Sequence, residues 1–179
     1  MKNTIVNKTF FILFFIFVFP TNLFALNIAT INIAYILEKS ISYNNFLDEL
    51  SNKKLDLQNT LNSKEKDLET LKQEIENSKL IISEDELNIL ISNYNNQVNN
   101  LDKEVQNINL FFSKNIEINK NIIIKQIITN IENISNNSNL DLIFTEDQYF
   151  MSSKKIDISD QIINLINKDI IVLKIIDGQ

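Results

Sequence analysis

The feature that most constrains this sequence is a pair of apolar heptad runs separated by four polar residues, 83–86. The first run keeps a three-then-four spacing interrupted only at Lys54, Lys64 and Ser78. Its apolar members are Leu47, Leu50, Leu57, Leu61, Leu68, Leu71, Ile75 and Ile82. The second run has no interruption and consists of Leu87, Ile91, Tyr94, Val98, Leu101, Val105, Ile108 and Phe112. Such a repeat makes helices wind around each other so that the apolar seam stays covered. We therefore predict a long antiparallel helical hairpin.

The turn between the two helices is predicted at residues 83–86. Ser83 and Glu86 have the spacing of a capping box, in which each side chain accepts the backbone amide of the other residue. The chain has one Gly and one Pro, at Gly178 and Pro20, so neither residue interrupts the runs. We expect two arms, 47–82 and 87–122, each about 54 Å long.

Short alternations of apolar and polar residues flank the hairpin. Residues 26–34 have the period of a strand with one buried face, followed by the start of a helix at 35–42. After the hairpin, residues 140–145 predict a second strand and 149–151 a third, joined by a hairpin turn at Glu146 and Asp147. A last helix, Ile158 to Lys168, is expected to be capped by Asp157. The tail 170–176 is β-prone, too short to cross a membrane, and has no assigned place.

The spacing changes near the base of the second arm. The steps from Ile108 to Phe112 to Ile116 are four and four residues, which is a stutter that locally unwinds a supercoil. We expect the returning helix to change packing partners there and to end within residues 135–139, where Asn can adopt the left-handed conformation.

The predicted fold class is α+β, with a coiled-coil arm on a small body of sheet and helix. We expect residues 26–179 to form one domain, with the body in 26–41 and 123–179 and the arm in 42–122. A two-helix rod buries only a narrow seam, and the remaining residues are too few for a large core. We therefore expect oligomerisation to complete the body.

The first 25 residues are typical of a secretory signal peptide. Lys2 and Lys8 precede an apolar stretch at 10–19, and Ala25 supplies the small residue expected at the cleavage site. The apolar stretch is short for a membrane span, so an uncleaved anchor is the less favoured alternative. We expect the mature chain to begin at Leu26 and to act outside the inner membrane, in the periplasm.

The composition argues against several classes of function. The formal net charge is −6, which becomes −8 without the signal peptide, and every basic residue is Lys. An acidic chain without Arg is not expected to bind nucleic acid. The absence of His and Cys excludes Ser–His and Cys catalysis, the usual zinc sites and disulfides. We predict that the protein is not an enzyme and has no catalytic residues, metal site or cofactor.

The order of these elements resembles the Skp/OmpH family of periplasmic chaperones. The resemblance is carried by residues 27–32 as the opening strand, by 140–144 and 149–151 as paired strands, and by 157–159 as the start of the last helix. It implies a homotrimer in which three arms surround a cavity below one shared body. It also implies an ATP-independent holdase that binds unfolded outer-membrane proteins and prevents their aggregation.

Two groups of candidate site residues follow. Apolar residues outside the seam could contact clients, widen the hairpin's own interface or be scattered surface residues: Leu55, Ile81, Leu90 and Phe111. Strand residues could contact other subunits or pack within one chain: Ile28, Ile31, Ile33, Leu142 and Phe144. Known members of the family are basic, whereas this chain is acidic. The charge argues against an electrostatic role at the membrane surface, and we carry over no lipopolysaccharide site.

A structural coiled-coil scaffold or adaptor of the cell envelope is the alternative function. A plain scaffold does not need a strand on each side of its hairpin, whereas a shared trimeric body does. The flanking strands therefore favour the chaperone.

Overall fold

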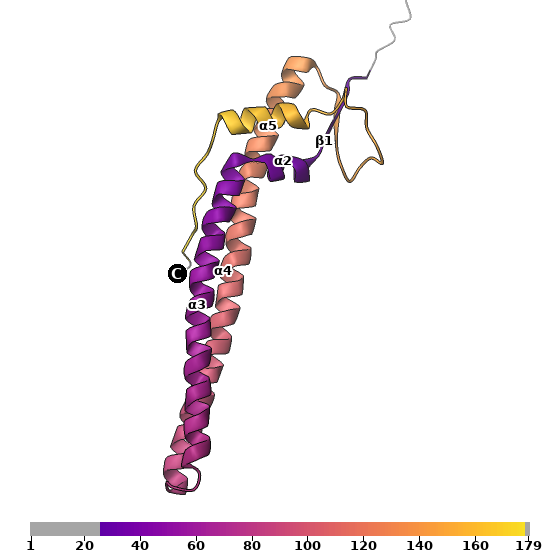
Figure 1. Cartoon of the computed structure of the whole chain (residues 1–179). Coiled ribbons are helices and arrows are strands. Elements are labelled where there is room, and N and C mark those ends of the chain that lie inside the picture. Colours follow the sequence, from indigo (N-terminus) through magenta and orange to yellow (C-terminus); the bar gives the residue numbers. More distant parts are fainter. Residues whose placement is uncertain (1–25, 178–179) are drawn as a thin grey trace, which may run out of the picture.

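The computed structural model describes residues 26–177, which form one long arm attached to a small body (Figure 1). The predicted signal peptide, residues 1–25, lies outside the described residues. The elements in chain order are β1 (Ile28–Ile31), α2 (Ile33–Lys39), α3 (Ile41–Ser78), α4 (Glu84–Ser138), β2 (Leu142–Thr145) and α5 (Ser159–Lys168). The prediction of a helical hairpin on a small body of sheet and helix is confirmed.

The arm consists of α3 and the part of α4 that lies antiparallel to it (Figure 1). The turn at the tip spans residues 79–83, slightly before the predicted position, because α4 begins at Glu84. Ser83 caps α4 in the predicted capping box: Ser83 N donates to Glu86 Oε2 at 3.0 Å, and Glu86 N donates to Ser83 Oγ at 3.4 Å. The acidic first turn also suits the positive end of the helix dipole.

Helix α4 continues without a break past Ile41, where α3 begins, and into the body. It ends at Ser138, and its C-cap Asn139 has a φ of 49°, the left-handed conformation expected for the Asn-rich segment. The predicted stutter at Ile116 is wrong, because Ile116 is exposed and Asn115 is buried instead. The seam spacing runs on through Asn115 and Asn119, and steps of four residues then carry the buried face to Ile123 and Ile127.

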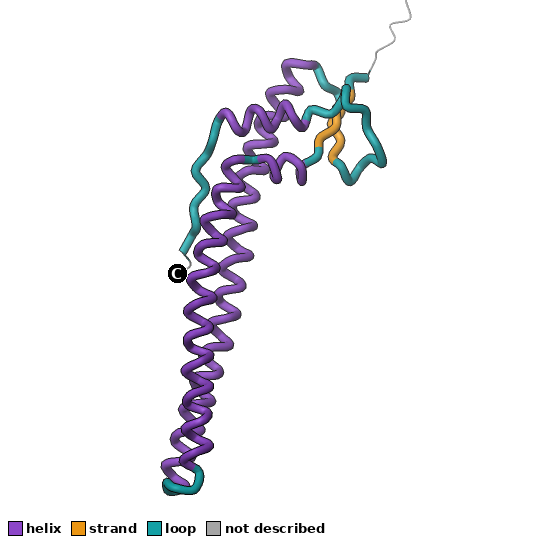
Figure 2. The backbone as a smooth tube through the Cα atoms, in the orientation of Figure 1, coloured by secondary structure: helices purple, strands orange, loops and turns teal. Residues whose placement is uncertain are grey.

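The sheet of the body has two parallel strands, with Ile28 opposite Leu142 and Ile31 opposite Thr145 (Figure 2). The predicted third strand at 149–151 is wrong, because these residues lie in an irregular loop. The other neighbour of β1 is the segment around Asp157: Thr30 N donates to Ile156 O at 2.8 Å, and Ile158 N donates to Thr30 O at 3.0 Å. The predicted β-hairpin at residues 146–147 is therefore also wrong.

Helices α2 and α5 pack against each other, and α5 also packs against α4 (Figure 1). The fully buried side chains at these contacts are Ile36, Ile123, Ile127, Ile162 and Ile166. The expected helix at 35–42 is interrupted at Ser40, whose extended backbone ends α2 and whose Oγ accepts the amide of Tyr43 to start α3. The last helix begins at Ser159, and Asp157 Oδ1 accepts the Ser159 amide at 2.9 Å.

Candidate functional site

The C-terminal tail, residues 169–177, runs from the end of α5 back along the arm (Figure 2). Side chains of the helices bind its backbone. Gln126 Nε2 donates to Asp169 O at 2.8 Å, and Ile171 N donates to Ser42 Oγ at 3.1 Å. Both hydrogen bonds use main-chain atoms of the tail, so they do not depend on the identity of its side chains.

Two asparagines of α4 extend this contact. Asn119 Nδ2 donates to Lys174 O at 3.1 Å. Asn115 binds Ile176 twice, because its Nδ2 donates to the carbonyl at 3.1 Å and its Oδ1 accepts the amide at 2.7 Å. This pair of bonds resembles what a neighbouring strand would offer. Asn115 and Asn119 are 2% and 1% exposed, and amides buried to this degree require partners.

The side chains of the tail alternate between the arm and solvent. Leu173 is 7% exposed, whereas Val172 is 81% exposed. Ile171 and Ile175, two residues on either side of Leu173, also pack against the core. We call the surface that holds the tail backbone, formed by Ser42, Asn115, Asn119 and Gln126, the tail groove.

The tail groove is absent from the sequence predictions, although a signal for it exists. Continuing the three-then-four spacing beyond Phe112 places Asn115 and Asn119 at seam positions. A polar side chain at a buried position is costly unless something satisfies it. Two asparagines in the seam therefore indicate a partner that supplies backbone groups, and the alternation in residues 171–175 indicates which segment supplies them.

A pocket of about 560 Å³ lies where the tail ends. Asn115 and Ile176 line it and so belong both to the pocket and to the contact between tail and groove. Its apolar lining consists of Leu57, Ile108, Leu110, Phe111 and Ile118. Its charged lining consists of Lys53, Glu104, Lys114 and Asp177.

The predicted client-contact residues do not form one site. Leu55 on α3 and Ile81 in the tip turn are exposed. Leu90 is half-buried on the first turns of α4. Phe111 is half-buried, lines the pocket and contacts the ring of Phe112 edge-on at 5.2 Å between centroids.

The tip of the arm carries more exposed apolar surface than the sequence analysis proposed. Leu80 precedes Ile81 in the turn, and Ile89 lies on the first turns of α4; all three side chains are exposed. These residues lie close in sequence to the acidic residues 84–86. The tip therefore combines apolar and negatively charged groups.

The candidate subunit contacts fall into two groups. Ile31 is 3% exposed, and Ile33 packs against the same core, so both are held within their own chain. Leu142 is exposed, and Ile28 and Phe144 are half-buried. Two further residues of the body that were not among the candidates, Phe150 and Met151, are exposed in the loop after β2.

The carboxylate of Glu146 has a structural role in the body. Burial opposes ionisation of Glu146, but hydrogen bonds from the backbone amides of Ile33, of Glu146 itself and of Ala34 hold its pKa below the ordinary value. Its carboxylate accepts the Ile33 amide at 3.0 Å and the Ala34 amide at 3.1 Å. Glu146 therefore ties the end of β2 to the start of α2.

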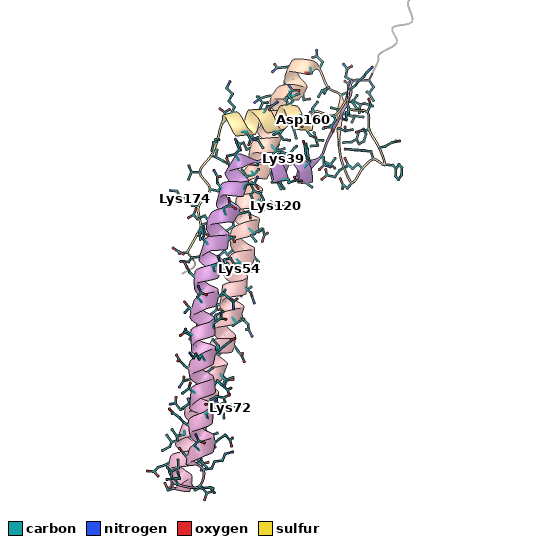
Figure 3. All side chains as sticks on the ribbon, in the orientation of Figure 1. Lys39, Lys54, Lys72, Lys120, Asp160 and Lys174 are labelled. Carbon is teal, nitrogen blue, oxygen red and sulfur yellow. The ribbon has the colours of Figure 1, made fainter. Side chains whose placement is uncertain are left out.

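Charged side chains are distributed along the arm and the body within residues 26–177. Figure 3 shows Lys39, Lys54, Lys72, Lys120 and Lys174 spread along the molecule. Within the described part of the chain, no three acidic side chains lie together as metal ligands. None of the helices there is both long and apolar enough to cross a membrane.

The fold is a helical hairpin on a small body, with exposed apolar groups along the arm and a C-terminal tail held through its backbone. The comparison with known families identifies it further. The chain belongs to the OmpH-like outer membrane protein family, whose pattern matches residues 27–166. The resemblance to Skp/OmpH proteins is thereby confirmed, and membership supports a chaperone role.

A solved structure shares the fold. It is the crystal structure of a candidate outer membrane chaperone, OmpH-like, from Caulobacter crescentus CB15. The two structures align with a TM-score of 0.71 and 12% sequence identity, over 84% of this chain and 89% of the other. Among curated proteins, none matches this sequence.

Proposed function

We propose that this chain is an ATP-independent periplasmic holdase that binds unfolded outer-membrane proteins and prevents their aggregation. The observation that carries the proposal is the apolar surface of the arm outside its seam. Leu55, Leu80, Ile81 and Ile89 are exposed. They are spread along the arm and its tip and do not form one cleft. Such a surface suits a long, unfolded client that makes many weak contacts.

The physical basis of the activity is competition with aggregation. An unfolded β-barrel protein exposes apolar strands that pair with those of other molecules. Contacts with an arm cover some of these strands and lower the concentration of exposed strands that can pair with another unfolded molecule. Release needs no nucleotide where insertion of the client into the membrane is more favourable than remaining bound.

We further propose that the holdase is a homotrimer joined through the body. The outer edge of β2 has no partner strand among the described residues, and exposed strand edges tend to pair. Leu142, Phe150 and Met151 add exposed apolar surface on the same part of the body. A monomer rarely leaves such groups uncovered together. Three copies would cover them and bring three arms around one cavity.

The holdase proposal is tested with the chain from Leu26 onward. A urea-unfolded outer-membrane barrel protein is diluted into buffer, and light scattering measures its aggregation. We expect substoichiometric amounts of the chain to suppress scattering. Replacing Leu55 and Ile81 by Ser should weaken this suppression, whereas the control variant with Asp56→Ser and Lys79→Ser, at neighbouring exposed positions, should retain it.

The outcome separates the chaperone from the scaffold. A monomer in solution that leaves client aggregation unchanged would overturn the holdase and favour an envelope scaffold. Equal loss of suppression in both double variants would show that the exposed apolar side chains are not the contact.

The subunit contact is tested separately. We expect the mass in solution, measured by light scattering after size-exclusion chromatography, to be that of three chains. Phe150→Asp should lower it towards that of one chain, while Ser153→Asp, in the same exposed loop, should not. Ile31 is unsuitable for this test because it is buried in its own chain and a charge there would unfold the body.

A further inference from the structure

We propose that the tail groove is a binding site for extended apolar segments of client proteins, and that the tail is its internal competitor. The proposal rests on the holdase function and specifies one site and one mode of contact for it. The tail itself is an example of an extended segment bound in the groove.

The hydrogen bonds of the groove are made to backbone atoms and do not depend on the sequence of the bound segment. Asn115 uses both its donor and its acceptor on one residue, Ile176, and Asn119 adds a bond to the carbonyl of Lys174. Any extended chain presents amides and carbonyls with the same repeat. A chaperone that receives many different sequences needs a contact of this kind.

The groove also selects for apolar residues at alternate positions. Leu173 is buried against the arm, and Val172 and Lys174 on either side of it are exposed. A strand of a membrane barrel has the same alternation, because one face meets lipid and the other meets the interior. The occupant that fits is therefore an unfolded segment of that pattern.

The pocket at the end of the tail gives such a segment room to continue. It shares Asn115 and Ile176 with the tail contact and lies farther along the arm, next to Leu57 and Ile108. A client segment can place further apolar residues there. The pocket and the groove thus form one continuous path.

The competition follows from the burial of the two asparagines. If the tail leaves, Asn115 Oδ1 loses the Ile176 amide, and the Nδ2 groups of Asn115 and Asn119 keep only their hydrogen bonds within α4. The loss of these bonds to the tail disfavours an empty groove. A client backbone restores those bonds. Because the tail is tethered to α5, its effective concentration is high, and only a client held at additional points on the arm displaces it.

The probe for the test is a fluorescent synthetic peptide with the sequence of residues 169–177, and anisotropy measures its binding. We expect Leu173→Asp to release the tail, so that the variant binds the peptide at least about tenfold more tightly than the unchanged chain does. Val172→Asp is the matched control, because it adds the same charge on the exposed side of the tail, and its affinity should equal that of the unchanged chain.

Two further measurements isolate the backbone contact. A peptide methylated at the amide nitrogen that corresponds to Ile176 cannot donate to Asn115. It should therefore bind the tail-released variant no more tightly than it binds the unchanged chain. Adding Asn119→Leu to Leu173→Asp should also remove the gain in affinity. If Leu173→Asp does not keep the helical circular dichroism of the unchanged chain, a chain ending at Asp169 replaces it and should show the same gain.

The results separate this inference from the holdase proposal. The groove proposal would be overturned if the unchanged chain and a folded tail-released variant bind the peptide with equal affinity, or if the methylated peptide binds fully. This holds even if the chain suppresses client aggregation. An increase in peptide affinity that depends on Asn119 supports the groove, even if no variant suppresses aggregation. In that case only the holdase proposal is rejected.

Discussion

The body and the outer part of the arm are stabilised in different ways. In the body, α2, α4 and α5 surround fully buried side chains such as Ile36 and Ile162. In the arm, α3 and α4 cover only one seam, and no residue of α4 from 84 to 114 is fully buried. The arm therefore depends on a repeated weak contact, and the body depends on a small number of strong ones.

Hydrogen bonds show the same difference. In the body, side chains bind backbone groups far away in sequence: Ser159 Oγ accepts the Asn32 amide at 2.9 Å, and Asn167 Oδ1 accepts the Ile41 amide at 2.9 Å. In the arm, most side-chain bonds join residues three or four positions apart. The body thus holds together segments that the hairpin has brought back from opposite ends of the chain.

The largest difference in stability between the two regions is expected when one isoleucine in each is truncated to alanine. Ile162→Ala removes a side chain that is 0% exposed and should lower the free energy of unfolding by about 3 kcal/mol. Ile91→Ala removes a seam residue that is 36% exposed and should lower it by about 1 kcal/mol. Urea denaturation followed by circular dichroism measures both. Equal losses would mean that the arm is packed as firmly as the body.

A smaller loss of stability is expected when one long-range hydrogen bond of the body is removed. Ser159→Ala removes the acceptor of the Asn32 amide at a buried position and should lower stability by about 2 kcal/mol. Ser153→Ala, in the exposed loop, should change it by less than about 0.5 kcal/mol. Similar unfolding midpoints for the two variants would contradict a role for this bond.

Glu146 makes the body sensitive to pH. Its folded pKa lies below the ordinary value, so its contribution to stability is complete above the unfolded pKa and is lost as the pH falls through the folded pKa. Glu146→Gln should lower stability at neutral pH by about 1 kcal/mol and flatten the acid decline. Thermal unfolding across the acidic range measures this. An unchanged pH profile in the variant would show that another group causes the decline.

The smallest change in stability is expected in the arm, where a substitution should stabilise the fold. Lys64 occupies a seam position and lies 2.7 Å from Glu104 Oε1 in an exposed ion pair. Such pairs contribute little, whereas an apolar residue continues the seam. Lys64→Leu should raise the free energy of unfolding by about 0.5 kcal/mol, read from the urea midpoint. A decrease would mean that the ion pair contributes more than the seam.

The same contrast explains which parts of the fold could be predicted. Seam burial repeats along α3 and α4, so the heptads predict both helices, and local rules predict the cap at Ser83 and the left-handed residue near Asn139. The break at Ser40 and the neighbour of β1 depend on groups far away in sequence, such as Asn167 and Asp157. No local pattern contains them.

The candidate site divides in the same way. Leu55 and Ile81 were predicted from their place outside the seam, and the structure leaves both exposed. The tail groove was not predicted, because its asparagines are polar residues at apolar positions and their partner is the end of the chain. Subunit contacts remain a prediction, since they depend on surfaces that one chain does not cover.

One consequence of the uninterrupted α4 concerns mechanics. The helix extends from the tip turn into the body, and only three residues separate its end from β2. A rod without a joint transmits a sideways force along its whole length, so a load applied at the tip acts as torque on the strand. An arm that swings outward must bend α4 or carry β2 with it. Unless α4 bends, an outward movement of the arm is therefore coupled to a displacement of the sheet.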